Sequence, residues 1–337
     1  MKHITAFALL LVVVSAGCQT TPRQTYPVTG YVERIDPALD AIVSPDARAE
    51  IIATGFDWSE GPLWVEKYHM LLFSDVPQNT IFKWTETRGK EIYLTPSGYT
   101  DTIKRGGETG SNGLTLDAEG NLILTQCGNR QIARMNAPLD APRPVFTSLA
   151  NRYDGKRFNS PNDIVMNSKG EIFFTDPPYG LEKYMSDPKK ETPYQGVYKV
   201  STAGEVTLLI DSLSRPNGIA FFPGEKTILI ANSDPAKANW YAYDIAANGT
   251  LTNGRIFQTA KGADKSLKGS PDGCKIDRHG NVFASAPGGI WIFNKEGKLL
   301  GKLRIDGNPV SNCSFSEDQK TLYATSDMNI LRFRLLP

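Results

Sequence analysis

The sequence is poor in cysteine, and its few cysteines follow no pairing pattern. Its 337 residues include four cysteines, at Cys18, Cys127, Cys274 and Cys313. The last three are scattered, and no Cys-x-x-Cys occurs, which argues against a disulfide framework and against a cysteine-ligated zinc site or a thiol-redox site. Histidine is also scarce, with three in the chain, and neither His69 nor His279 is expected to be catalytic.

An excess of charge of one sign is lacking as well. The chain has 37 basic and 36 acidic residues, for a net charge of +1 at pH 7, and no basic cluster. This balance argues against a nucleic-acid partner. The chain also has no Gly-x-Ser-x-Gly sequence, so a covalent serine hydrolase is not expected. The apolar run over residues 4–14 is too short to span a membrane.

The first residues predict export. Lys2 and His3 precede the apolar run, and Ser15-Ala16-Gly17 lead directly to Cys18. This order resembles a bacterial lipoprotein signal over residues 1–17, with Cys18 lipidated as the mature N-terminus. An ordinary signal peptide cleaved nearby is the alternative. Gln19 favours anchoring at the outer membrane, facing the periplasm, so that the protein contacts a membrane only through Cys18.

The rest of the chain divides into a tether and one domain. Residues 18–45 are rich in Pro, Thr and polar side chains without a sustained period, which predicts a tether. Residues 46–337 are enough for one domain with a large core, and no second domain is needed. We expect a monomer or a weak oligomer.

A repeat within residues 46–337 predicts the fold. Six times, a polar residue leads into an apolar run, a tight turn and a second run rich in β-formers, at intervals of roughly 40 to 55 residues. The lead residues are Glu60, Asn112, Asn162, Asn217, Asp272 and Asn312. Such units are typical of propeller blades, so we predict an all-β, six-bladed β-propeller. The strand-like run 48–54 is expected to close the sixth blade from its outer edge.

The same repeat predicts a metal site. In a propeller the first strand of each blade lines the central channel, so the six lead residues should meet at one mouth, with Asp75, Asp176, Asp234 and Asp327 returning to the same face. Carboxylate and amide oxygens suit a hard divalent cation. Ca²⁺ is the first expectation, and Mg²⁺, Mn²⁺ and Zn²⁺ remain open. The alternative is that these residues serve only as turn formers.

Five motifs carry a resemblance to a known family. They are EGPLW at 60–64, GKRFNSPNDI at 155–164, FTDPPYGL at 174–181, RPNGIAF at 215–221, and PDG at 271–273 followed by PGGIWIF at 287–293. Together they resemble the senescence marker protein/regucalcin/gluconolactonase family of six-bladed, calcium-dependent hydrolases, and its gluconolactonase-like branch in particular. The resemblance covers residues 50–335.

The resemblance implies a set of site residues. The metal ligands would be Glu60, Asn162, Asn217 and Asp272, four of the six lead residues. Asn112 and Arg157 would face the substrate. The chain departs from the family where Cys127 replaces a common His on the substrate side, and where Cys274 replaces a usual Met. Either thiol could be a ligand or a small apolar side chain, and the departure leaves substrate choice open.

The family implies hydrolysis of a sugar lactone by metal-polarised attack of water. Asp272 is the first candidate to accept the proton of that water. Because a metal-bound carboxylate is a weak base, Asp163, Asp176 and Asp234 are alternatives. Two further functions stay open. One is hydrolysis of aryl esters or phosphotriesters at the same site, and the other is a lipid-anchored propeller that binds without catalysis.

Overall fold

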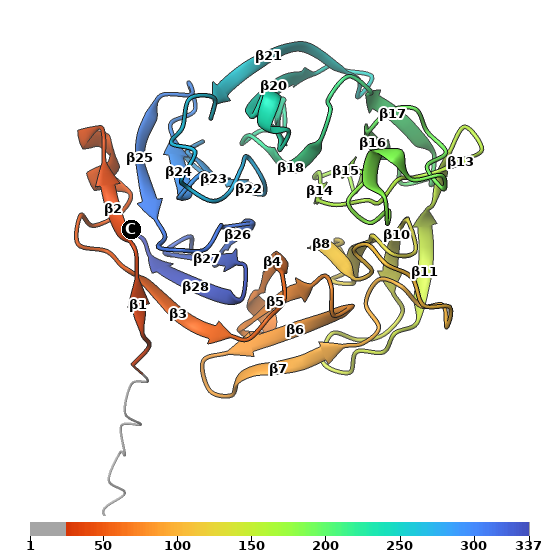
Figure 1. Cartoon of the computed structure of the whole chain (residues 1–337), viewed down its shortest axis with the longest axis horizontal. Coiled ribbons are helices and arrows are strands. Elements are labelled where there is room, and N and C mark those ends of the chain that lie inside the picture. The colour runs from red at the N-terminus through yellow and green to blue at the C-terminus, as the bar shows by residue number, and fades with distance from the viewer. Residues whose placement is uncertain (1–24, 337) are drawn as a thin grey trace, which may run out of the picture.

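Six antiparallel sheets surround a central channel (Figure 1). The computed structural model describes residues 25–336. Apart from N-terminal strands at the outer edges of two sheets, each sheet begins with its innermost strand and steps outward along the chain. The predicted all-β, six-bladed β-propeller is therefore confirmed.

The strands of the first three blades, innermost first, are β4 (Ser59–Val65), β5 (Met70–Asp75), β6 (Thr80–Thr85) and β7 (Gly89–Leu94); β8 (Ser111–Leu116), β9 (Leu122–Gln126), β10 (Gln131–Met135) and β11 (Phe146–Ala150); β14 (Ile164–Met166), β15 (Ile172–Asp176), β16 (Gly196–Val200) and β17 (Val206–Ile210). Those of the last three are β18 (Pro216–Phe221), β19 (Thr227–Asn232), β20 (Asn239–Ile245) and β21 (Leu251–Thr259); β22 (Cys274–Ile276), β23 (Val282–Ala286), β24 (Gly289–Phe293) and β25 (Leu299–Arg304); β26 (Asn312–Phe315), β27 (Thr321–Ser326) and β28 (Asn329–Arg334).

Short elements lie between and before the blades. A separate hairpin pairs β12 (Arg152–Tyr153) with β13 (Lys156–Arg157), and the 3-10 helices are η1 (Pro37–Ala41), η2 (Glu66–Tyr68), η3 (Tyr184–Ser186) and η4 (Pro235–Lys237). Among residues 25–336, no helix has the length and apolar character that a membrane span requires.

The second strands form the core between neighbouring blades. Every residue of β5, β15 and β23 is buried, because both faces of an inner strand pack against adjacent sheets. The turns that precede β9 and β23 are tight. Gly120 and Gly280 have φ values of +81° and +88°, a conformation that side chains with a Cβ rarely adopt. These turns confirm the predicted hairpins.

The N-terminal segment completes two blades. As predicted, β3 (Ala49–Thr54) pairs with β28 and closes the sixth blade from outside. β1 (Val28–Thr29) then pairs with β3. β2 (Tyr31–Arg34) pairs with β25, opposite Gly301 to Arg304, and so becomes a fifth strand of the fifth blade.

The tether expected over residues 18–45 therefore needs correction. From Val28 onward this segment is part of the propeller, because its short strands pair with the outer edges of two blades and provide hydrogen-bond partners for the backbone there. η1 adds Leu39, which is 1% exposed, to the core of the last two blades. The predicted signal over residues 1–17 and the lipidation of Cys18 lie outside the described residues.

An ion-pair cluster joins the ends of the ring. Arg332 on β28 is 3% exposed, and its Nε donates to Glu50 Oε2 of β3 at 2.6 Å. Its Nη1 donates to Glu86 of the first blade, and its guanidinium lies over the ring of Trp84. One buried side chain thus connects the last blade to the first and to the N-terminal strand.

Candidate active site

Six side chains occupy equivalent positions around one mouth of the channel. Each lies at the start of the innermost strand of its blade or up to two residues before it. They are Glu60, Asn112, Asn162, Asn217, Asp272 and Asn312. All are buried except Asp272, which is partly buried. The structure thus brings together the positions that the sequence repeat selects.

Glycines after these residues let the blades approach closely. A Cβ on Gly61 would lie 1.8 Å from Asn112 O, and a Cβ on Gly218 would lie 2.2 Å from Asp272 O. Both distances are far below van der Waals contact. The recurring Glu-Gly, Asn-Gly and Asp-Gly pairs therefore have a steric origin, because each glycine leaves room for the lead residue of the next blade.

Hydroxyl groups on the second strands hold the lead residues in place. Thr125 Oγ1 on β9 donates to Asn162 O at 2.7 Å, and Thr175 Oγ1 on β15 donates to Asn217 O at 2.7 Å. Ser74 Oγ on β5 donates to Asn112 O at 2.9 Å. Each of the first three blades thereby fixes the backbone of the lead residue in the following blade. These hydrogen bonds hold the backbone from which the side chains of the ring project.

The ring concentrates negative charge in a buried place. Burial raises the pKa of Glu60 well above its usual range, and the nearby carboxylates of Asp272 and Asp163 raise it further. Burial likewise raises the pKa of Asp272, and the negative charges of Asp163 and Glu108 raise it further. Hydrogen bonds to the Asp272 carboxyl group, including the one with Asn217, oppose this rise. A cation among these groups would offset the repulsion between carboxylates that adds to both pKa shifts.

The donor set fits a hard divalent cation. Two carboxylates and two amides supply oxygens, and Asp272 Oδ1 and Asn112 Oδ1 are buried without a hydrogen-bond partner within residues 25–336. Buried acceptors of this kind normally have a partner, and a cation can provide one. No cluster of three or more His, Cys, Asp or Glu in the same range has metal-binding geometry, and a site of two carboxylates with two amides does not need one.

Asn312 differs from the other lead residues. Its Oδ1 accepts a hydrogen bond from Cys313 N at 2.8 Å and one from Lys275 Nζ at 3.3 Å. Burial alone would lower the pKa of Lys275, but the carboxylate of Asp163 holds it above the usual value. Lys275 is thus a charged group of the channel wall that the sequence analysis missed. The alternation of Cys274, Lys275 and Ile276 along β22 was the available signal.

The aspartates at the ends of the second strands have structural partners. Asp75 accepts Asp57 N at 3.0 Å, and Asp234 accepts Ala236 N at 2.9 Å and the Ser214 hydroxyl at 2.6 Å. The oxygens of Asp176 accept Asn159 N and Ser160 N at 2.7 and 2.8 Å. Burial raises the pKa of Asp176 to about 7. These carboxyl groups hold the segments that lead into the ring.

The two unusual cysteines are buried thiols. Cys127 is 1% exposed, and its Sγ donates to Pro161 O at 3.2 Å. Cys274 is fully buried. Burial raises the pKa of both thiols far above neutrality, so neither is a thiolate that could serve as a soft metal ligand. Their contacts fit the alternative of small packing side chains.

Arg157 lies at the rim rather than in the ring. It is on β13, and its Nη2 donates to Asn129 O at 2.9 Å. Together with Arg105 and Arg130 it lines a cavity of about 330 Å³. Burial lowers the pKa of Arg130, and the positive charge of Arg157 lowers it further. The structure therefore groups Arg157 with two other guanidinium groups, and its predicted role toward the substrate stays a prediction.

Glu108 is the carboxylate that the sequence analysis missed. It lies in the connection between β7 and β8, four residues before Asn112, and outside the repeat. Burial raises the pKa of Glu108 to about 7, and its charge adds to the effect of burial in raising the pKa values of Asp272 and Cys127. The sequence gave little signal for Glu108, because it lies in a Gly-rich connection outside the repeat. Without a repeat position, the sequence does not indicate whether its side chain faces the channel.

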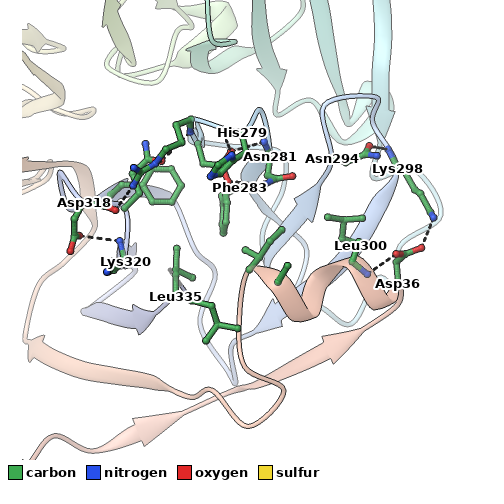
Figure 2. Close-up of a pocket in the computed structure, with 18 residues that line it drawn as sticks. Asp36, His279, Asn281, Phe283, Asn294, Lys298, Leu300, Asp318, Lys320 and Leu335 are labelled. Atoms are coloured by element: carbon green, nitrogen blue, oxygen red, sulfur yellow. Dashed lines mark hydrogen bonds and ion pairs between the residues drawn. The ribbon is translucent and has the colours of Figure 1, made fainter.

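The opposite mouth has a different character. His279 lies in the turn between β22 and β23, at the far end of β22 from Asp272. It lines a cavity of about 610 Å³ whose floor includes Phe283, Leu300 and Leu335. Figure 2 shows this cavity, with Asp36 and Lys298 paired at one edge and Asp318 and Lys320 at the other. Apolar side chains dominate the floor, and the oxygen ring is not part of it.

A six-bladed β-propeller with a buried ring of carboxylate and amide oxygens at one channel mouth defines the class of this protein. The sequence pattern of the family described as "SMP-30/Gluconolactonase/LRE-like region" matches residues 58–328. The chain belongs to this family. A gluconolactonase from Zymomonas mobilis is 41% identical over 310 residues, which cover 90% of this chain and 86% of that protein.

Solved structures agree with this assignment. A gluconolactonase from Xanthomonas campestris has a TM-score of 0.78 at 29% identity and covers 95% of this chain and 100% of its own. Regucalcin from Agrobacterium tumefaciens, described as a calcium-binding protein, has a TM-score of 0.65 at 16% identity and covers 84% of this chain and 92% of its own. The second likeness shows the shared fold alone.

Proposed function

We propose that this protein is a metal-dependent hydrolase that opens sugar lactones of the gluconolactone type. The observation that carries the proposal is the buried oxygen set of Glu60, Asn162, Asn217 and Asp272, at the positions that the family resemblance selects. The 41% identical relative over 90% of the chain is named a gluconolactonase. The pentonolactonase of Haloferax volcanii, 20% identical over 82% of the chain, supports the same substrate class.

The four oxygen donors would hold one divalent cation, with Ca²⁺ favoured because a related propeller is described as a calcium-binding protein. When bound, such a cation supplies Lewis-acid polarisation of a carbonyl group. Asp272 accepts the proton of the attacking water while a new C–O bond forms at the lactone carbonyl carbon. The ring C–O bond then breaks, and the proton passes to the departing ring oxygen, which leaves an open-chain hydroxy acid.

The contacts of the other aspartates support Asp272 as the proton acceptor. Asp163 Oδ1 accepts Ile164 N at 2.9 Å, and its Oδ2 accepts Ile219 N at 3.2 Å. Asp176 and Asp234 are also hydrogen bonded to backbone N–H groups. Asp272 Oδ1, in contrast, has no partner among residues 25–336. Hydrogen bonds from Gly273 and Asn217 lower the pKa of Asp272, but its Oδ1 can still take a proton, whereas both oxygens of the other three carboxyl groups are occupied.

A substrate panel tests the proposal. Soluble protein lacking residues 1–18 is assayed with glucono-δ-lactone, other aldonolactones, an aryl ester and a phosphotriester, with calcium and after chelation. We expect the aldonolactones to be hydrolysed fastest, chelation to lower the rate at least about 100-fold, and calcium to restore it. A faster rate with the phosphotriester or aryl ester would favour the alternative hydrolase. No turnover and no metal binding by calorimetry would favour a binding propeller.

We also propose that the mature protein is a lipoprotein of the outer membrane that faces the periplasm. The small residues before Cys18 and the glutamine after it support this location. Full-length protein is expected in the detergent-soluble membrane fraction, and the Cys18→Ser variant in the soluble fraction. Equal partition of both proteins into the soluble fraction would contradict lipid anchoring at Cys18. Lactonase activity measured in both fractions controls for folding.

A further inference from the structure

The connection between β7 and β8 is fastened across the second and third blades. Arg105 Nη1 donates to Gly128 O at 2.8 Å, and its Nη2 donates to Gly180 O. Gly107 has a φ of +78°, and a Cβ there would lie 2.8 Å from Gly180 O. The connection thus rests on the segments that follow β9 and β15. Arg105 acts as a positioning residue for the residues that come directly after it.

These contacts bring the carboxyl group of Glu108 to the oxygen ring. A Cβ on Gly107 would lie 3.2 Å from Glu182 N, and one on Gly180 would lie 3.2 Å from the Cβ of Cys127, so the connection packs against the segment beside Cys127. Beyond the effect of burial, the charge of Glu108 also adds to the raised pKa values of Asp272 and Cys127. Glu108 Oε2 is buried and has no hydrogen-bond partner among the described residues. Asn112 Oδ1 and Asp272 Oδ1 share this property. Three unpartnered acceptors therefore belong to one region of the site.

A structural role does not explain Glu108. The buried carboxyl groups of Asp75, Asp163 and Asp176 each accept hydrogen bonds from two backbone N–H groups. Glu108 Oε2 accepts none, and the guanidinium of Arg105 is engaged by carbonyl groups instead. An unpaired buried acceptor destabilises a fold. A ligand that donates hydrogen bonds would give this carboxyl group the partner that the protein does not supply.

We propose that Glu108 binds a hydroxyl group of the lactone and makes the site selective for polyhydroxylated lactones over unsubstituted ones. The inference rests on the lactone hydrolysis proposed above and deepens it. The hydroxyl groups of a sugar lactone are donors, which Glu108 Oε2 and Asn112 Oδ1 both accept. A δ-lactone without hydroxyl groups leaves Glu108 unpaired, and sites built around such hydrogen bonds reject analogues that lack the donor.

The test compares two lactones with one variant. Wild type and Glu108→Gln are assayed with glucono-δ-lactone and with δ-valerolactone, which has the same ring without hydroxyl groups. We expect Glu108→Gln to lower kcat/KM for the sugar lactone about 10- to 100-fold, mainly through KM, because a carboxylate acceptor is replaced by a neutral amide oxygen, which accepts a weaker hydrogen bond. The value for δ-valerolactone should change less than about threefold, because it makes no such bond. An equal loss for both substrates, or no loss for either, would overturn the proposal.

Two further measurements separate this role from folding and from the activity itself. Glu119→Gln, an exposed glutamate in the turn after β8, is the matched control and should behave as wild type. The melting temperature of Glu108→Gln should equal or exceed that of wild type, because burial raises the pKa of Glu108 to about 7 and its ionised form is costly to bury; a lower value would indicate a structural role instead.

Binding of D-glucose, a cyclic polyol without the lactone carbonyl, is measured by calorimetry and needs no turnover. At least tenfold weaker binding by Glu108→Gln supports the proposal even if no lactone is hydrolysed. Equal binding by both proteins, or no binding by wild type, counts against it. Failure of the substrate panel with retained Glu108-dependent glucose binding would therefore reject the lactonase and keep the polyol site.

Discussion

Replacing Asp272 with Asn is expected to lower kcat/KM for glucono-δ-lactone by about 10³-fold or more. The substitution removes the proposed proton acceptor and one of the two carboxylates among the four proposed ligands, and loss of a positioned acid–base group alone costs about 10²- to 10⁴-fold. Steady-state kinetics at saturating calcium gives the rate effect, and calorimetry with calcium gives the change in affinity. A large fall in rate with calcium still bound would locate the loss in proton transfer.

Asp234→Asn is the matched control for this prediction. Asp234 lies in the fourth blade, and its carboxyl group caps η4 and accepts the Ser214 hydroxyl. We expect its kcat/KM to stay within about threefold of wild type, because its oxygens have structural partners. If Asp234→Asn loses activity and Asp272→Asn keeps it, the assignment of the proton acceptor is wrong.

Removing β3 is expected to prevent stable folding. A chain that begins at residue 55 lacks the strand that pairs with β28 and contributes Ala49 and Ile52 to the core. It also leaves Arg332 without Glu50. The exposed edge of β28 and the broken ion pair both act at the junction of the last blade with the first. We expect aggregation or no cooperative unfolding transition by circular dichroism, against a clear transition for residues 25–337.

A shorter deletion provides the comparison. A chain that begins at residue 35 lacks β1 and β2 but keeps η1 and β3. The lost pairing of β2 with β25, including the ion pair between Glu33 and Lys302 at 3.2 Å, should lower the melting temperature by about 5 to 10 °C without preventing folding. Equal melting temperatures for the chains that begin at residues 35 and 55 would contradict the closure by β3.

The fold was predictable because its information is local and repeated. Each blade has its own apolar runs and a turn between them, and the period of these units is visible without knowing any contact. The closing strand was predictable for a related reason, because residues 48–54 form an apolar run outside all six units. β1 and β2 were not, since two and four residues are too few to show a period, and the partner of Tyr31 is Arg304.

The positions of the oxygen ring were determined by the sequence itself. Glu60, Asn162, Asn217 and Asp272 lie at or just before the starts of equivalent strands, and propeller geometry brings equivalent strands to one axis. Three of these residues are followed by glycines, whose role is evident only from their close contacts with the neighbouring blade. The same holds for the hydroxyl groups of Thr125 and Thr175, which donate to backbone carbonyl groups of the next blade.

Only the tertiary structure decided which carboxyl groups remain without partners. Asp176 and Glu108 look alike in sequence, as acidic residues next to Gly- or Pro-rich connections. In the folded chain the first accepts two backbone N–H groups, and an oxygen of the second accepts none within the described residues. Hydrogen-bond satisfaction depends on segments that meet across blades. No local pattern encodes it, and for Glu108 it followed from the contacts of Arg105 with the second and third blades.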